Sequence, residues 1–368
     1  MSHNRSNNAE RLEQLRTRVK IDRDGVNSIS SSDFPFHSSN VYPEFDSIEI
    51  FRKKLKIKVI KKSQFEMEFD LIGVDAAIAN ALRRVMIAEV PTMAIEKVYI
   101  YDNTSIIQDE VLAHRLGLIP IKVDPDLFYF KHENERPTDM NTIVFKINHE
   151  CRYNPRARED ESDPKQLYIG HNLLSSSLIW DPKGEQAERF TDNPIKPVHD
   201  DILIAQMRPG QRMELEAHCE KGIGKEHAKW SPVATATYRL MPEIIVKEEI
   251  TGDLADKFAA CFSKGVIDVV EKEINDEMVK TAKVVNPRLD TVSREVLRHK
   301  EFDNKVELTR IRDHFIYTVE STGILESERI FIDAIHIMQT KCSRLLLALE
   351  NKLKELEDER NMMSLDDV

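Results

Sequence analysis

The sequence predicts an α+β protein, and three observations support this prediction. Alternating apolar and charged residues over 55–71 are typical of a β-hairpin. Residues 75–90 follow at once and repeat apolar side chains at helical spacing, and a second helical pattern covers 327–356. Between them, short strand patterns alternate with loops rich in proline and charge. We therefore expect helices near both ends and a β-rich middle.

Composition limits the possible functions. With 368 residues the chain can form two or three domains with real cores. It carries 53 Lys and Arg against 64 Asp and Glu, a net charge of -11, so any nucleic-acid contact needs a local basic patch. No apolar run reaches the ~18 residues that span a bilayer, and no secretory signal is evident. We expect a soluble intracellular protein that makes no membrane contact.

Cysteine usage argues against metal and disulfides. The four cysteines are scattered and form no C-x-x-C pair, which fits a reducing compartment and predicts no metal and no cofactor. They are Cys151, Cys219, Cys261 and Cys342.

Residues 1–40 are rich in Ser, Asn and charge without a periodic apolar face, and they predict a flexible tail. The hairpin follows. Its outer face sets lysines on one strand against acids on the other, and its inner face is a strip of seven apolar side chains that needs a cover. The strip comprises Leu55, Ile57, Val59, Phe65, Met67, Phe69 and Leu71.

The segment from Gly73 to Pro91 predicts a helix that supplies this cover. Asp75 is suited to cap its start, and Pro91 ends it. The predicted buried face comprises Ile78, Ala81, Leu82 and Val85. The side chains that point elsewhere are Asn80, Arg83 and Arg84.

The middle of the chain predicts strands over 95–101, 142–147, 167–169, 201–207 and 213–219, with a short helix over 109–116 that carries His114 and Arg115. The loop over 221–232 contains two glycines, three lysines and a Trp, but it lacks Walker A spacing. Two interpretations stay open: a fixed loop that contacts protein, or a contact to phosphate or nucleic acid.

Residues 243–298 predict a small β-α-β-β-α unit with helices over 253–262 and 291–298. A strand over 311–319 precedes the C-terminal helix. The residues after it, 357–368, predict a flexible acidic tail.

The C-terminal helix carries an apolar seam whose members recur at spacings of 4, 3, 4, 3, 4 and 7 residues. This 3.5-residue repeat is typical of a helix that pairs with another helix along a shared interface. The alternative is a seam that packs only within its own domain. The seam comprises Phe331, Ile335, Met338, Cys342, Leu345, Leu349 and Leu356.

Sequence signatures of catalysis are missing. The chain contains no G-x-S-x-G, no H-E-x-x-H and no G-x-G-x-x-G after a strand. Two classes remain: a protein–protein scaffold, which the patterns favour, and an enzyme whose site is built from unlinked residues.

Several motifs resemble the α-type assembly subunits of cellular DNA-dependent RNA polymerases. They are Asn80 to Val85 followed by Val90-Pro91, His114 to Pro120, Pro197 to Ala205, and Gly222 to Pro242. The last two are similar to the forty-kilodalton class shared by eukaryotic polymerases I and III. The likeness covers about residues 40 to 350. The alternatives are the polymerase II counterpart and a stand-alone nucleic-acid-binding protein.

The resemblance implies a discontinuous dimerisation domain (45–94 and 303–356), an inserted β-rich domain (95–240) and a ferredoxin-like subdomain (241–300) that lacks its cluster cysteines. It implies pairing with a smaller α-like subunit and docking of the second-largest and largest subunits. Asn80, Arg83 and Arg84 would contact the second-largest subunit, joined by His114 and Arg115. The resemblance also implies that this chain reaches DNA only through the assembled complex. It places the complex in the nucleus, including the nucleolus.

Overall fold

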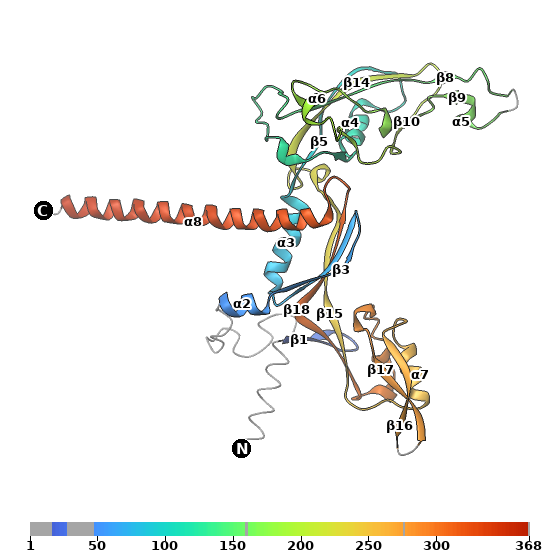
Figure 1. Cartoon of the computed structure of the whole chain (residues 1–368), viewed down its shortest axis with the longest axis vertical. Helices are drawn as coiled ribbons and strands as arrows, with labels where there is room; N and C mark the ends of the chain where they lie inside the picture. Colours follow the sequence, from blue (N-terminus) through green and yellow to red (C-terminus); the bar gives the residue numbers. More distant parts are fainter. Residues whose placement is uncertain (1–16, 28–47, 159–160, 275–276, 367–368) are drawn as a thin grey trace. The chain divides into compact units, whose positions relative to one another are not determined.

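The computed structural model of this chain describes residues 17–27, 48–158, 161–274 and 277–366 (Figure 1). It divides into two compact units, each assembled from separated segments. The first unit comprises Met1–Lys61, Glu68–Asn80 and Thr237–Thr318. The second comprises Lys62–Met67, Ala81–Ala236 and Val319–Val368. The domain boundaries given above stay predictions.

A six-stranded sheet organises the first unit. Its strands follow the order β2-β1-β18-β4-β3, and β15 also pairs with β18. The predicted hairpin is confirmed as β3 and β4, which Figure 1 draws in blue. The strands are β1 (Arg18–Ile21), β2 (Val26–Asn27), β3 (Lys56–Lys62), β4 (Glu66–Ile72), β15 (Val233–Val246) and β18 (Val306–Ser321).

The predicted strip of seven inner apolar residues is only half correct. On β4, Met67, Phe69 and Leu71 are buried, and the Phe69 ring stacks on Tyr317 of β18. All of β3 is exposed instead. The difference follows from position in the sheet, because β4 lies between two strands while β3 is the last strand of the order.

Two of the hairpin's three acids pair with an arginine outside the hairpin rather than with its lysines. Glu68 and Asp70 both accept hydrogen bonds from the Arg288 guanidinium, at 2.5 Å each. A guanidinium fork can hold two carboxylates at once, whereas an exposed lysine pair contributes little.

The flexible tail predicted over 1–40 is wrong at β1 and β2. Val19 and Ile21 are buried as β1 pairs with β18, and Arg18 binds Glu243 of β15. Four residues are too few to show a periodicity, which is why the sequence missed them. The rest of the predicted tail, 1–16 and 28–40, lies outside the described residues. Helix α2 (Ile48–Lys54) was also not predicted.

Helix α3 (Ala76–Ala88) confirms the predicted helix, and the Asp75 carboxylate caps it by accepting from the Ala77 N–H at 2.7 Å. The predicted buried face is confirmed at Leu82 and Val85, but Ala79 and Met86 are also buried, and Ile78 is exposed. The Tyr317 hydroxyl donates to the Ala79 carbonyl. This bond ties α3 to β18 at the buried Ala79.

A four-stranded antiparallel sheet, ordered β11-β7-β14-β5, organises the second unit. Its core combines apolar side chains of these strands with Leu112 and Leu116 of α4 (Asp109–Gly117). The sheet strands are β5 (Pro91–Asn103), β7 (Ile143–Glu150), β11 (Ile179–Trp180) and β14 (Arg212–Ile223). Smaller elements are β6 (Ile121–Lys122), η2 (Pro125–Leu127), β8 (Arg152–Tyr153), α5 (Pro164–Leu167), β9 (Tyr168–Ile169), β10 (Asn172–Leu174), η3 (Ser175–Ser177), α6 (Gln186–Arg189), β12 (Lys196–Pro197), β13 (Leu203–Gln206) and η4 (Ala228–Trp230).

Residues 241–300 only partly follow the predicted β-α-β-β-α pattern. Helix α7 (Asp253–Ala260) packs with the hairpin of β16 (Ile267–Ile274) and β17 (Glu277–Val284). The helix predicted over 291–298 is wrong. Val292 and Arg294 adopt left-handed backbone conformations, with φ of 58° and 62°, which no α-helix accommodates. Short 3₁₀ turns occupy this region: η5 (Pro287–Leu289), η6 (Glu295–Arg298) and η7 (Lys300–Phe302).

The C-terminal helix α8 (Ser327–Asp366) confirms the helix predicted from residue 327, and Figure 1 shows it as one uninterrupted helix in red. The helix continues to Asp366, through residues for which the sequence predicted a flexible acidic tail (357–368), and Glu, Arg and Met in this segment are good helix formers. The flexibility of the segment stays a prediction. Residues 367–368 lie outside the described residues. None of the helices in the described ranges is long and apolar enough to cross a bilayer.

Candidate subunit interface

The start of α8 is firmly attached within the second unit. Ile330, Phe331 and Ala334 are buried. The Arg329 guanidinium donates to Asp124 and to Asp126, at 2.7 Å each. The hydrogen bond from Arg329 lowers the pKa of Asp124, so this pair stays ionised at neutral pH. The first two turns therefore hold the helix in place.

A second ion pair lies farther along α8. The Lys341 ammonium binds both carboxylate oxygens of Glu89, at 2.7 and 2.9 Å. Glu89 directly follows the last residue of α3, so this pair ties the end of α3 to α8.

Beyond its buried start, α8 presents an uncovered apolar surface. We call it the α8 stripe: Ile335, Met338, Cys342, Leu345, Leu349, Leu353 and Leu356. At 3.6 residues per turn these side chains fall within an arc of about 80°. The isoleucine and the leucines are 40–63% exposed. Covering them would contribute about 4–8 kcal/mol, taking roughly 1.5–3 kcal/mol for each full aliphatic side chain.

The predicted seam residues are thus brought together on one face, with two differences. Phe331 is buried within the unit rather than offered to a partner. Leu353, which sequence spacing left out, belongs to the stripe because it follows Leu349 by four residues. The back of the helix carries the exposed Leu347, roughly 160° from the middle of the stripe.

The polar residues predicted on α3 lie at its surface to different degrees. Asn80 and Arg83 are half-buried, and Arg84 is exposed. Of these three residues, Arg84 is therefore the most accessible to a partner.

His114 and Arg115 lie in the last turn of α4 and have different environments. The Arg115 guanidinium donates to the Leu203 carbonyl at 2.7 Å and to the Ile204 carbonyl at 3.0 Å, so it fixes β13 to α4. His114 is exposed, with its ring 6.0 Å from that of His227. Arg115 therefore has a structural role that the sequence did not reveal.

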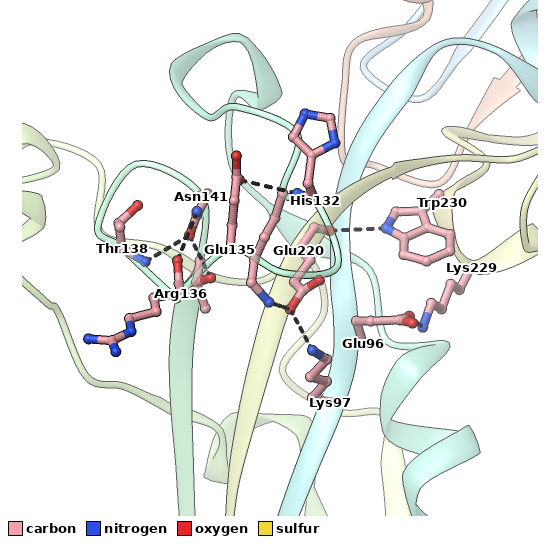
Figure 2. A network of polar contacts seen from close by, with 12 residues as sticks. Glu96, Lys97, His132, Glu135, Arg136, Thr138, Asn141, Glu220, Lys229 and Trp230 are labelled. Carbon is pink, nitrogen blue, oxygen red and sulfur yellow. Dashed lines mark hydrogen bonds and ion pairs between the residues drawn. The ribbon is translucent and has the colours of Figure 1, made fainter.

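The loop over 221–232 is fixed by its own lysines and its tryptophan (Figure 2). Lys229 binds the Ile95 carbonyl at 2.9 Å and the Glu96 carboxylate. The Trp230 indole N–H donates to the Glu220 carbonyl at 3.0 Å. Figure 2 shows these residues turned toward the strands.

Lys221 is also turned inward, toward the Pro125 and Phe128 carbonyls at 2.7 and 3.0 Å, and burial lowers its pKa. Lys221 and Lys229 bind protein groups, which favours the fixed-loop interpretation over a phosphate contact.

The cysteines show no arrangement suited to catalysis. Burial raises the pKa of the Cys151, Cys219 and Cys261 thiols, which keeps them protonated. Within the described ranges, no group of three His, Cys, Asp or Glu side chains could hold a metal ion. Cys342 alone is exposed, on the α8 stripe.

An exposed apolar helix face of this kind is typical of a surface that another protein covers. Comparison with known proteins agrees, because the model of the RNA polymerase Rpb3/Rpb11 dimerisation domain matches residues 68–342. The chain belongs to this family of non-catalytic RNA polymerase subunits.

Comparison with individual relatives shows which class of polymerase subunit this chain is more similar to. DNA-directed RNA polymerases I and III subunit RPAC1 of Bos taurus is 48% identical over 343 residues, covering 93% of this chain and 98% of that protein. Two proteins of Dictyostelium discoideum allow a comparison within one organism. The polymerases I and III subunit is 44% identical, covering 90% of this chain and 93% of its own. The polymerase II subunit rpb3 is 32% identical, covering 78% and 92%. The chain is therefore more similar to the class shared by polymerases I and III than to the polymerase II counterpart.

Proposed function

We propose that this chain is the non-catalytic assembly subunit of RNA polymerases I and III. It pairs with a smaller α-like subunit, and the pair then recruits the second-largest and largest subunits for synthesis of ribosomal RNA precursors and small RNAs. The α8 stripe is the observation that supports this proposal, because no other described residue covers it. The complex works in the nucleus, including the nucleolus, and this subunit meets DNA only through its partners.

The proposal assigns different surfaces to different partners. The α8 stripe binds the smaller α-like subunit and is part of a discontinuous dimerisation domain. The second-largest subunit contacts Asn80, Arg83 and Arg84. The same contact includes His114 and Arg115. Arg84 is the exposed cation among the three residues on α3, so its reversal to Glu is expected to weaken recruitment of the large subunits while leaving the smaller pair intact.

Co-expression with a tagged smaller α-like subunit tests the pairing. We expect a 1:1 complex, and a soluble monomer that ignores the partner would refute the proposal. Replacing Leu345 and Leu349 together by Asp should abolish the complex. Covering their exposed fractions contributes about 2–3.5 kcal/mol, and an interface would also have to bury two charges.

Leu347→Asp is the matched control for a single Leu345→Asp substitution. The two leucines are similarly exposed, at 58% and 63%, and both variants add the same charge to α8. Only Leu345 lies on the stripe. Equal loss of pairing in both variants would mean that added charge, rather than the stripe, governs the result.

A further inference from the structure

Strand β3 has an open edge. It is the last strand of the six-stranded sheet, bonded to β4 on one side. On its other side it meets no strand among the described residues. An open edge presents a row of backbone N–H and C=O groups that can accept another strand.

The side chains of β3 are as open as its backbone. All seven residues are exposed. Ile57, Val59 and Ile60 are 43–53% exposed, although β-branched side chains of this kind normally pack against a neighbour. An incoming strand would cover part of this apolar surface, which gives it a gain beyond backbone hydrogen bonds.

Charge indicates which kind of strand fits. Residues 52–62 contain seven Lys and Arg and no acid, in a chain whose net charge is -11. Lys62 pairs with Glu328. Lys56 and Lys58 have no carboxylate partner in the described part of the chain, and Arg288 holds Glu68 and Asp70 of the neighbouring β4.

We propose that β3 is a docking edge for an acidic, extended segment of a partner polypeptide, which adds to the sheet as a further strand. Backbone bonds would provide the pairing, and Asp or Glu side chains alternating with apolar ones would complement Lys56, Lys58 and their apolar neighbours. Single-stranded nucleic acid fits less well, since β3 contains no aromatic side chain on which a base could stack. This edge is separate from the α8 stripe and does not depend on the pairing proposed above.

A peptide-binding experiment tests the proposal. The probe is a fluorescent peptide of about nine residues that alternates valine and glutamate, a length typical of strands. We expect the full-length chain to bind it, as measured by anisotropy. A version that is N-methylated at alternate residues should bind at least about tenfold more weakly, because it lacks the donors that strand addition needs. Unchanged binding of the N-methylated peptide would overturn strand addition.

Charge reversal tests complementarity. The Lys56→Glu, Lys58→Glu double variant should lose the glutamate peptide and bind a valine–lysine peptide instead. An oligouridine that binds the unaltered chain more tightly than the glutamate peptide would overturn the choice of an acidic polypeptide. The Leu345→Asp, Leu349→Asp variant should still bind the peptide, which separates this edge from the α8 stripe.

Two neighbouring proline variants test the edge itself. Successive N–H groups along a strand point to opposite edges, so only one of Lys58→Pro and Val59→Pro removes an outward donor. That variant should lose peptide binding and keep its thermal stability, while the other weakens the pairing with β4. Full peptide binding by both variants would refute the proposal.

Discussion

Arg288 links the turn η5 to strand β4 through two carboxylates, and replacing it by Leu tests how much this contact stabilises the fold. Its side chain is 14% exposed and its guanidinium lies 2.5 Å from Glu68 and 2.5 Å from Asp70. Asp70 is 8% exposed, and its other oxygen lies 3.3 Å from His314. Both acids are on β4, while Arg288 belongs to η5.

The expected loss in the free energy of unfolding follows from the burial of Asp70. Arg288→Leu leaves the Asp70 carboxylate buried without its cation, and breaking a buried pair in this way costs about 3–5 kcal/mol. Glu68 adds less, because water reaches it. Adding Asp70→Asn to Arg288→Leu should recover a large part of the loss, since no unpaired charge then stays buried.

Urea unfolding followed by circular dichroism measures this loss. Arg298→Leu is the matched control: this arginine lies in the neighbouring turn η6, is 65% exposed, and pairs with Glu295. Its replacement should change the free energy of unfolding by less than about 0.5 kcal/mol. A loss at Arg288 no larger than that at Arg298 would refute the reasoning.

Two further predictions concern the second unit. Acid should loosen the start of α8: the hydrogen bond from Arg329 lowers the pKa of Asp124 below its ordinary value of 3.8, so its stabilisation is complete above that pH and is lost as the pH falls through the lowered value. Amide hydrogen exchange in the first turns of α8 should then become faster. The increase should be smaller in Arg329→Ala, which lacks this bond already. An exchange rate that does not rise as the pH falls through this range would contradict the prediction. Gly222→Ala would press a methyl group into the Trp230 ring and cost about 1–3 kcal/mol in thermal unfolding, whereas Gly25→Ala, with open space around it, should cost far less.

The sequence predicted the elements that have strong local signals. Helix α3 has Asp75 at its start and Pro91 just past its end, and α8 repeats apolar residues over many turns. Such patterns arise because one face of a helix must be apolar to be covered, so they can be recognised without tertiary information. The candidate interface was predictable for the same reason.

Contacts between distant segments were not predictable. Arg288 reaches Asp70 and Glu68 of β4 from 218 and 220 residues away, so these two acids pair outside the hairpin. The structural role of Arg115 was hidden for the same reason, because its guanidinium binds carbonyls 88 and 89 residues away. Backbone conformation was hidden as well: the left-handed Arg294 interrupts what the sequence presents as a helical segment.

The uncovered α8 stripe has a consequence for the life of the chain before assembly. Exposed apolar surfaces attract other proteins, and under the proposed pairing a newly made copy carries this surface until its partner binds. Binding a partner stabilises only the copies that find one, by mass action. An excess of this chain would be open to chaperones and proteases, so the amount that accumulates in a cell should follow the supply of its partner.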